Sequence, residues 1–196
     1  MRKRDLEIAL ESVKPFEDPD PALEQYATPA TMAADVLFRA YSVGDVAGKV
    51  VWDYGCGTGV FAIGAALLGA SESHGIDVSP AAIAIARENA ERLGVDVSFV
   101  QGDVSSAGGG DTVFMNPPFG CQNRNADRVF LEKAIACSES AYSFHMESTL
   151  GFVTDFVAAR GKEAALVATY KYYIPHTFTF HRRTKQGIDV AVVNIR

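Results

Sequence analysis

The stretch that decides the fold is Val50-Val51-Trp52-Asp53-Tyr54-Gly55-Cys56-Gly57-Thr58-Gly59. It runs from a short apolar segment through glycines into a second apolar segment, which predicts a strand, a tight turn and a helix. Glycines let the backbone turn sharply and approach a ligand that a Cβ would obstruct. In doubly wound folds, ligands bind at such a turn, at the carboxyl end of the first strand. A purely structural turn has the same pattern, so the motif alone identifies no ligand.

After this turn, short β-rich runs alternate with helical stretches. Strands are predicted over 49–54, 73–77, 95–100, 112–115, 141–145, 164–173 and 188–195, and helices between them over 60–68, 80–93, 127–138 and 148–160. This rhythm predicts an α/β fold with a doubly wound, Rossmann-like sheet of seven strands and helices on both faces. No helix separates the last two strands, so we expect them to form an antiparallel hairpin.

The length and the N-terminal pattern predict the domain organisation. A chain of 196 residues suits a single domain over 1–196. Residues 1–47 predict a helical extension, with an amphipathic helix around Leu6, a proline-containing connector and a second helix from Thr31 to Tyr41. We expect Thr28 or Thr31 to cap this second helix.

The composition excludes several classes of protein. With 48% hydrophobic and 21% charged residues, the chain is expected to be globular and not disordered. No apolar run reaches the about 20 residues that span a bilayer, and the three cysteines lack metal-site spacing, so we expect a cytoplasmic protein without a metal site. The net charge is −6, yet residues 171–196 hold five Lys or Arg and one Asp, which favours a local polyanion contact.

Acids end the second and third predicted strands. Asp77 closes Gly75-Ile76-Asp77, where a carboxylate accepts hydrogen bonds from ribose hydroxyls. S-adenosylmethionine (SAM) and NAD share this demand, so Asp77 indicates a nucleoside without choosing between them. Asp103 follows the third strand, and taken alone it is more often a helix cap or a turn residue.

The sharpest motif is Asn116-Pro117-Pro118-Phe119, at the carboxyl end of the fourth predicted strand. Two prolines fix φ and remove two donors, so this elbow is stiff and its carbonyls are free to accept hydrogen bonds. The lone pair of an adenine N6 amine is delocalised, and acceptors on both amino hydrogens favour a more tetrahedral, nucleophilic nitrogen. The Asn116 side-chain oxygen and the Pro117 carbonyl suit this task. Phe119 offers a ring to an unstacked base, or anchors the loop in the core.

Together these motifs resemble the class I SAM-dependent methyltransferases, and more closely the methyltransferase-like protein 5 family of ribosomal RNA adenine-N6 methyltransferases. The likeness also includes Leu23-Glu24-Gln25-Tyr26-Ala27-Thr28, Tyr142-Ser143-x-His145 and Pro175 to His181. It implies a class I methyltransferase sheet and methyl transfer from SAM to the N6 amine of an adenine in small-subunit ribosomal RNA.

The resemblance also implies functional residues. Catalysis is expected from Asn116, Pro117, Pro118 and Phe119. Cofactor contacts are expected from Gln25, Tyr26, Thr28, Asp53, Gly55, Gly57, Thr58, Val60, Asp77, Asp103 and Val104, with residues 1–47 closing over SAM and Asp103 bonding the adenine amino group. Phosphate contacts to RNA are expected from His181, Arg182, Arg183 and Lys185, for which a solvated turn is the alternative.

A partner protein is a further implication of the resemblance. Family members are stabilised by a small zinc-binding activator protein, which adds a strand beside the third strand of the methyltransferase. Residues 95–100 alternate apolar residues, and we expect them at a sheet edge whose backbone groups need cover. A loop of the same chain is the alternative cover.

Three other functions stay open at this point. A methyltransferase that modifies a glutamine amide of a translation release factor solves the same electronic problem with N-P-P-Y, where this chain has Phe119. An NAD(P) dehydrogenase leaves the N-P-P-F motif without a task. A catalytically silent RNA-binding factor that keeps the cofactor fold is the third.

Overall fold

A seven-stranded sheet forms the centre of the structure, a computed structural model that describes residues 1–20, 23–119, 126–174 and 186–196. Its strands are β1 (Val50–Tyr54), β2 (Glu72–Asp77), β3 (Ser98–Gln101), β4 (Gly110–Met115), β5 (Ser138–Met146), β6 (Ala164–Ile174) and β7 (Gln186–Ile195). They lie in the order β3-β2-β1-β4-β5-β7-β6. Strands β1 to β5 pair in parallel, and β7 is antiparallel to both β5 and β6. The predicted doubly wound sheet with a closing antiparallel hairpin is confirmed.

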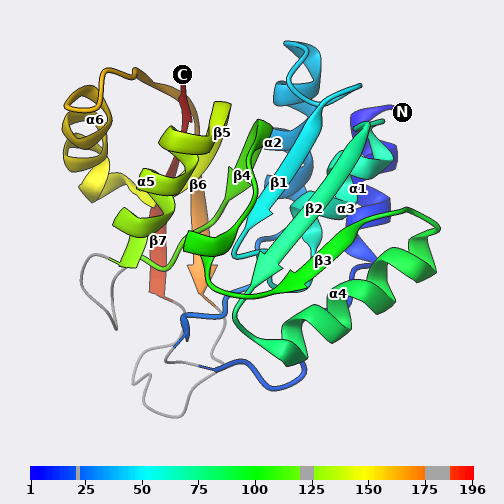
Figure 1. The fold of residues 1–196 in the computed structure, drawn as a ribbon. Helices are drawn as coiled ribbons and strands as arrows, with labels where there is room; N and C mark the ends of the chain where they lie inside the picture. Colours follow the sequence, from blue (N-terminus) through cyan, green and yellow to red (C-terminus); the bar gives the residue numbers. More distant parts are fainter. Residues whose placement is uncertain (21–22, 120–125, 175–185) are drawn as a thin grey trace.

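Helices cover both faces of this sheet (Figure 1). One apolar cluster joins the sheet to α1 (Lys3–Glu11), α2 (Ala30–Ser42), α3 (Val60–Leu67) and α4 (Pro80–Leu93). The other cluster joins the opposite face to α5 (Ala126–Cys137) and α6 (Leu150–Ala158). Short 3-10 turns, η2 (Val104–Ser106) and η3 (Glu147–Thr149), precede β4 and α6. Within the described ranges, no helix has both the length and the apolar character needed to cross a membrane.

The alternation of side chains along β1 explains why the two faces have separate cores. Val51 belongs to the cluster under α1 to α4, whereas Tyr54 belongs to the cluster under α5 and α6. Because β4 is central, it is covered on both faces, and its last four residues are buried. Phe114 of β4 stacks on Phe61 of α3 and on Tyr142 of β5, with ring centroids 5.7 and 5.2 Å apart. This aromatic column fixes α3, and the turn before it, against the sheet.

Two local predictions are wrong. The third strand begins at Ser98 and not at residue 95, because the Val95 amide donates to the Ala90 carbonyl and closes the C-terminus of α4 instead of pairing with β2. Neither Thr28 nor Thr31 caps α2, whose N-cap is Pro29 without a side-chain hydrogen bond. The Thr28 hydroxyl accepts a hydrogen bond from elsewhere, as described below.

Candidate active site

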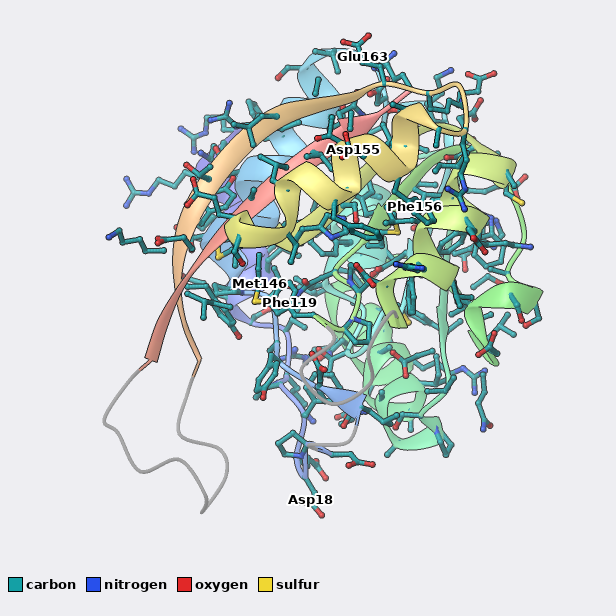
Figure 2. All side chains as sticks on the ribbon, turned by 90° about the vertical axis from the view of Figure 1, so that its left-hand side faces the viewer. Asp18, Phe119, Met146, Asp155, Phe156 and Glu163 are labelled. Atoms are coloured by element: carbon teal, nitrogen blue, oxygen red, sulfur yellow. The ribbon has the colours of Figure 1, made fainter. Side chains whose placement is uncertain are left out.

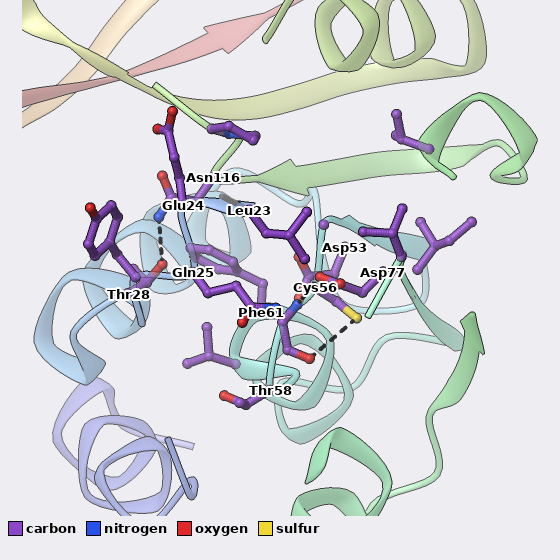
Figure 3. A pocket seen from close by; sticks show the side chains of 18 of the residues that line it. Leu23, Glu24, Gln25, Thr28, Asp53, Cys56, Thr58, Phe61, Asp77 and Asn116 are labelled. Atoms are coloured by element: carbon purple, nitrogen blue, oxygen red, sulfur yellow. Dashed lines mark hydrogen bonds between the residues drawn. The ribbon is translucent and has the colours of Figure 1, made fainter. Parts of the chain in front are cut away.

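A cavity of about 240 Å³ lies at the carboxyl edge of the sheet, where β1, β2 and β4 end (Figure 3). It is lined by every residue predicted to contact the cofactor, namely Gln25, Tyr26, Thr28, Asp53, Gly55, Gly57, Thr58, Val60, Asp77, Asp103 and Val104. Of the four residues predicted to be catalytic, Asn116 and Pro118 line the cavity. Pro117 is buried beside them, and the half-buried Phe119 packs against the core under α1 to α4.

The glycine turn forms one wall of the cavity. Gly57 has a φ of +51°, and a Cβ added there would lie 2.8 Å from Cζ of Phe16. The amides of Gly55 and Cys56 both donate to the Ile76 carbonyl of β2, at 2.9 Å each. The turn is therefore tied to the neighbouring strand, and a larger residue at position 57 would strain the left-handed backbone and push aside the ring of Phe16.

Asp53 lies beneath this turn and is only 1% exposed. Its Oδ2 accepts a hydrogen bond from the Ala62 amide at 3.1 Å, in the first turn of α3. The N-cap of α3 is Gly59, which has no side chain to offer, so Asp53 supplies an acceptor to the helix N-terminus from the strand below. Burial, reinforced by the charge of Asp77, raises the pKa of Asp53 to about 7.

Asp77 is held by two backbone amides. Its Oδ2 accepts from Gly57 at 2.8 Å and its Oδ1 accepts from Ser79 at 2.9 Å. Burial raises the pKa of this carboxyl despite these hydrogen bonds. Since each carboxylate oxygen has two lone pairs, acceptor capacity remains for hydroxyl groups in the cavity.

Asp103 lies at the rim of the cavity. Its side chain is exposed, and Oδ1 accepts from the Ser105 amide at 2.8 Å at the start of η2. Hydrogen bonding from Ser105, first from its side chain and then from its amide, lowers the pKa of Asp103. Asp103 therefore caps η2 and also lines the cavity.

The elbow after β4 presents the most informative atom of the site. Asn116 donates from Nδ2 to the Thr28 hydroxyl at 3.0 Å. Its Oδ1 is buried without a hydrogen-bond partner, and it is the one side-chain polar atom in this state among the described residues. A buried acceptor left unsatisfied costs about 1–3 kcal/mol, so this oxygen is suited to a donor on a ligand.

His145 is removed from this chemistry. It is 2% exposed in β5, with Nε2 2.6 Å from the Ser143 hydroxyl, and it does not line the cavity. Burial lowers the pKa of His145 to about 4, so the imidazole is neutral at neutral pH. His145 is therefore a core residue and takes no part in lining the cavity.

Sequence patterns did not indicate the apolar part of the lining. The residues concerned are Phe16, Phe61, Val78 and Phe130. The lining also includes Leu23, Glu24, Ala27, Cys56, Ile76 and Gly102, which belong to the quoted motifs or flank them. Phe16 comes from the connector before α2 and Phe130 from the second turn of α5. Neither position follows a motif, because both reach the cavity through tertiary packing.

An exposed arginine, Arg128, lies close in sequence to the lining residue Phe130. Arg128 lies in the first turn of α5, two residues before Phe130, and its guanidinium stands 4.9 Å from the ring centroid of the exposed Phe152. At the other end of α6, which turns Phe156 toward α5 (Figure 2), Arg160 covers that ring and pairs with Glu132 at 2.8 Å. The predicted RNA contacts His181, Arg182, Arg183 and Lys185 lie outside the described residues.

Comparisons with known proteins agree with this geometry. A family model described as a methyltransferase domain matches residues 45–152. The rRNA N(6)-adenosine-methyltransferase METTL5 of Danio rerio is 37% identical over 205 residues, which cover 100% of this chain and 98% of the relative. The chain belongs to the methyltransferase-like protein 5 family. Another similar protein, from Methanocaldococcus jannaschii, is 37% identical over 208 residues, or 100% of this chain and 94% of that one.

The family assignment extends to the three-dimensional structure. A crystal structure of a protein from Pyrococcus horikoshii superposes with a TM-score of 0.91 at 40% identity, and the match covers 100% of this chain and 97% of that chain. As a member of the methyltransferase-like protein 5 family, this protein is a SAM-dependent methyltransferase. The cavity fits SAM, since a glycine turn, a carboxyl with spare acceptors and an unsatisfied amide oxygen converge on it.

Proposed function

We propose that this protein methylates the N6 amine of an adenosine in small-subunit ribosomal RNA. The observation that carries the proposal is the buried, unpartnered Oδ1 of Asn116 at the cavity wall. An exocyclic amine is the complementary donor, because it offers two N–H groups and gains nucleophilicity when acceptors bind them. The activity in the name of the Danio rerio relative has such an acceptor substrate.

The elbow, residues 116–119, is proposed to bind the adenine amine for methyl transfer. SAM, when bound, supplies an electrophilic methyl group on a sulfonium sulfur. Asn116 Oδ1 accepts one amino hydrogen of adenine and the Pro117 carbonyl accepts the other, which draws the nitrogen toward a tetrahedral form without a strong base. Thr28 fixes the orientation, because Nδ2 donates to its hydroxyl and the planar amide then aims Oδ1 away from it. Phe119 is proposed to stack on the flipped base or to hold the loop in the core.

The proposed cofactor contacts divide by chemistry. Asp77 accepts the ribose hydroxyls, and the second oxygen of Asp103 accepts the adenine amino group of SAM. Gly55 and Gly57 permit close backbone approach. The N-terminal extension closes over the cofactor through residues 23–28, which line the cavity.

A partner protein is proposed at the free edge of the sheet. In the described residues β3 pairs with β2 alone, and Val100 is 46% exposed. Unpaired strand edges are templates for an added strand. We assign this edge to a small zinc-binding activator protein, and the phosphate contacts to His181, Arg182, Arg183 and Lys185.

A labelling experiment tests the function. The protein is incubated with methyl-labelled SAM and either separated ribosomal subunit RNAs or a translation release factor, and the products are digested and identified by mass. Label in N6-methyladenosine from small-subunit RNA, lost in Asn116→Ala, is the expected result. Label on glutamine would assign the protein to the alternative reaction, and label in large-subunit RNA alone would remove the small-subunit assignment.

A further inference from the structure

The backbone donors of the elbow are few. Pro117 and Pro118 have no amide hydrogen, so the next N–H after Asn116 belongs to Phe119. This N–H donates to Oε2 of Glu24 at 2.7 Å, across 95 positions of sequence. At the other end of the elbow, Asn116 donates to Thr28 at 3.0 Å. One short segment, residues 24–28, therefore holds both ends of the elbow.

The backbone of Glu24 is in an unusual conformation. Its φ is +50°, and in the described part of the chain it is the one non-glycine residue with a positive φ. The left-handed region is unfavourable for residues with a Cβ, and residues held there cluster at functional sites. The Tyr26 amide donates to the Glu24 carbonyl at 2.8 Å, which stabilises the turn. The result is a side chain only 9% exposed, directed at the elbow (Figure 3).

The same segment also belongs to the cofactor cavity. Residues 25–28, which follow Glu24 directly, line it together with Glu24 itself. One segment of backbone, residues 24–28, thus contacts both the cavity for the methyl donor and the elbow proposed to bind the methyl acceptor. A displacement of this backbone would move the elbow relative to the glycine turn on the opposite wall.

We propose that Glu24 is a positioning residue for methyl transfer. By accepting the Phe119 N–H, it fixes the far end of the elbow and so the direction in which Asn116 Oδ1 and the Pro117 carbonyl face. Because residues 25–28 line the cavity, SAM that contacts them also steadies the elbow before RNA binds. The inference rests on the proposed function for its kinetic consequence, but the Glu24 contact itself does not depend on the substrate.

Two amide variants of Glu24 separate the effect of positioning the elbow from the effects of losing the carboxylate charge and of impaired folding. Glu24→Gln keeps an acceptor oxygen at the same reach, whereas Glu24→Asn is shorter by one methylene. Asn tolerates positive φ, so the short variant is compatible with the backbone of this turn. We expect Glu24→Asn to lower kcat about 100-fold, as about 1 Å of misplacement does, and Glu24→Gln to retain kcat within about threefold. The Kd of SAM, measured by calorimetry, changes less than about fivefold in both variants.

Amide exchange supplies a readout that is independent of activity. In protein labelled with 15N-phenylalanine, the Phe119 amide is one of 12 phenylalanine signals, and the other signals report on the fold. We expect Phe119 exchange to accelerate at least about tenfold in Glu24→Asn and to stay near wild type in Glu24→Gln, because the hydrogen bond protects it. Saturating SAM slows Phe119 exchange in the wild type.

The outcomes are distinguishable. Wild-type kcat in Glu24→Asn, or equal loss in both variants, would overturn the positioning role, and so would unchanged Phe119 exchange in Glu24→Asn. If the wild-type protein makes no N6-methyladenosine, the proposed function fails, while amide exchange still decides whether Glu24 holds the elbow.

Discussion

Replacing Asp53 with Asn should stabilise the SAM-free protein above pH 7. Asp53 is 1% exposed, and its pKa is raised from 3.8 to about 7, chiefly by burial. The unfolded chain ionises this group as the pH passes about 4, whereas the folded chain keeps the proton until the pH nears 7. The stability contributed by Asp53 is therefore complete at low pH and lost as the pH rises through this window. At about 1.4 kcal/mol per pKa unit, the total loss is of the order of 4 kcal/mol.

Asn keeps the acceptor for the Ala62 amide and never ionises, so Asp53→Asn escapes this loss. Urea unfolding of wild type and variant between pH 5 and pH 8 measures this loss of stability. The free energy of unfolding of the variant, relative to wild type, is expected to grow by about 2–3 kcal/mol over this range at constant m-value. The exposed Asp18→Asn is the control and should change stability by less than about 0.5 kcal/mol. A pH-independent difference, or a variant less stable than wild type at pH 8, would refute the reasoning.

Three further substitutions test the walls of the site. If the exposed Arg128 contacts RNA phosphate, Arg128→Gln should raise the KM for RNA about threefold to tenfold and weaken its salt dependence. Arg160→Gln, whose charge is already paired with Glu132, should change neither, and equal effects of the two variants would contradict an RNA contact at Arg128. Gly57→Ala should weaken SAM binding at least about tenfold in calorimetry, because the new Cβ meets Phe16 at 2.8 Å in a left-handed backbone; unchanged affinity would contradict it. Thr28→Val should lower kcat about tenfold and Thr28→Ser should not, since the Thr28 hydroxyl orients the Asn116 amide that we propose to be catalytic. Equal kcat values in steady-state assays would refute this.

The fold was predictable because periodicity in this chain is regular. Apolar runs and helical spacing placed all seven strands and the four helices between them, and parallel strands necessarily bring their carboxyl ends to one edge. The convergence of the glycine turn, Asp77 and Asn116 could therefore be predicted from the sequence. The predicted start of β3 was wrong because the end of α4, with its C-cap at Gly94 and the Val95 amide bonded back to Ala90, competes locally with strand pairing.

The missed part of the site depends on tertiary packing. Phe16 and Phe130 line the cavity from a connector and from a helix, and no spacing in the sequence links either to the glycine turn. The Thr28 hydroxyl looked like a helix cap, because N-cap preference is a local rule, whereas its actual donor is 88 positions away. Phe119 packs on the core in the structure, so its stacking on a base stays a prediction.

The acceptor geometry at Asn116 has one most direct test. It is a crystal structure of the protein with S-adenosylhomocysteine and a ribosomal RNA fragment that contains the target adenosine before methylation, with both of its amino hydrogens. We predict that the adenine N6 lies about 3 Å from both Asn116 Oδ1 and the Pro117 carbonyl, with the sulfur of the cofactor product on the opposite side of the nitrogen. An adenine whose amine faces away from Asn116, or an Asn116 Oδ1 that is bonded to a protein group in the complex, would contradict the mechanism.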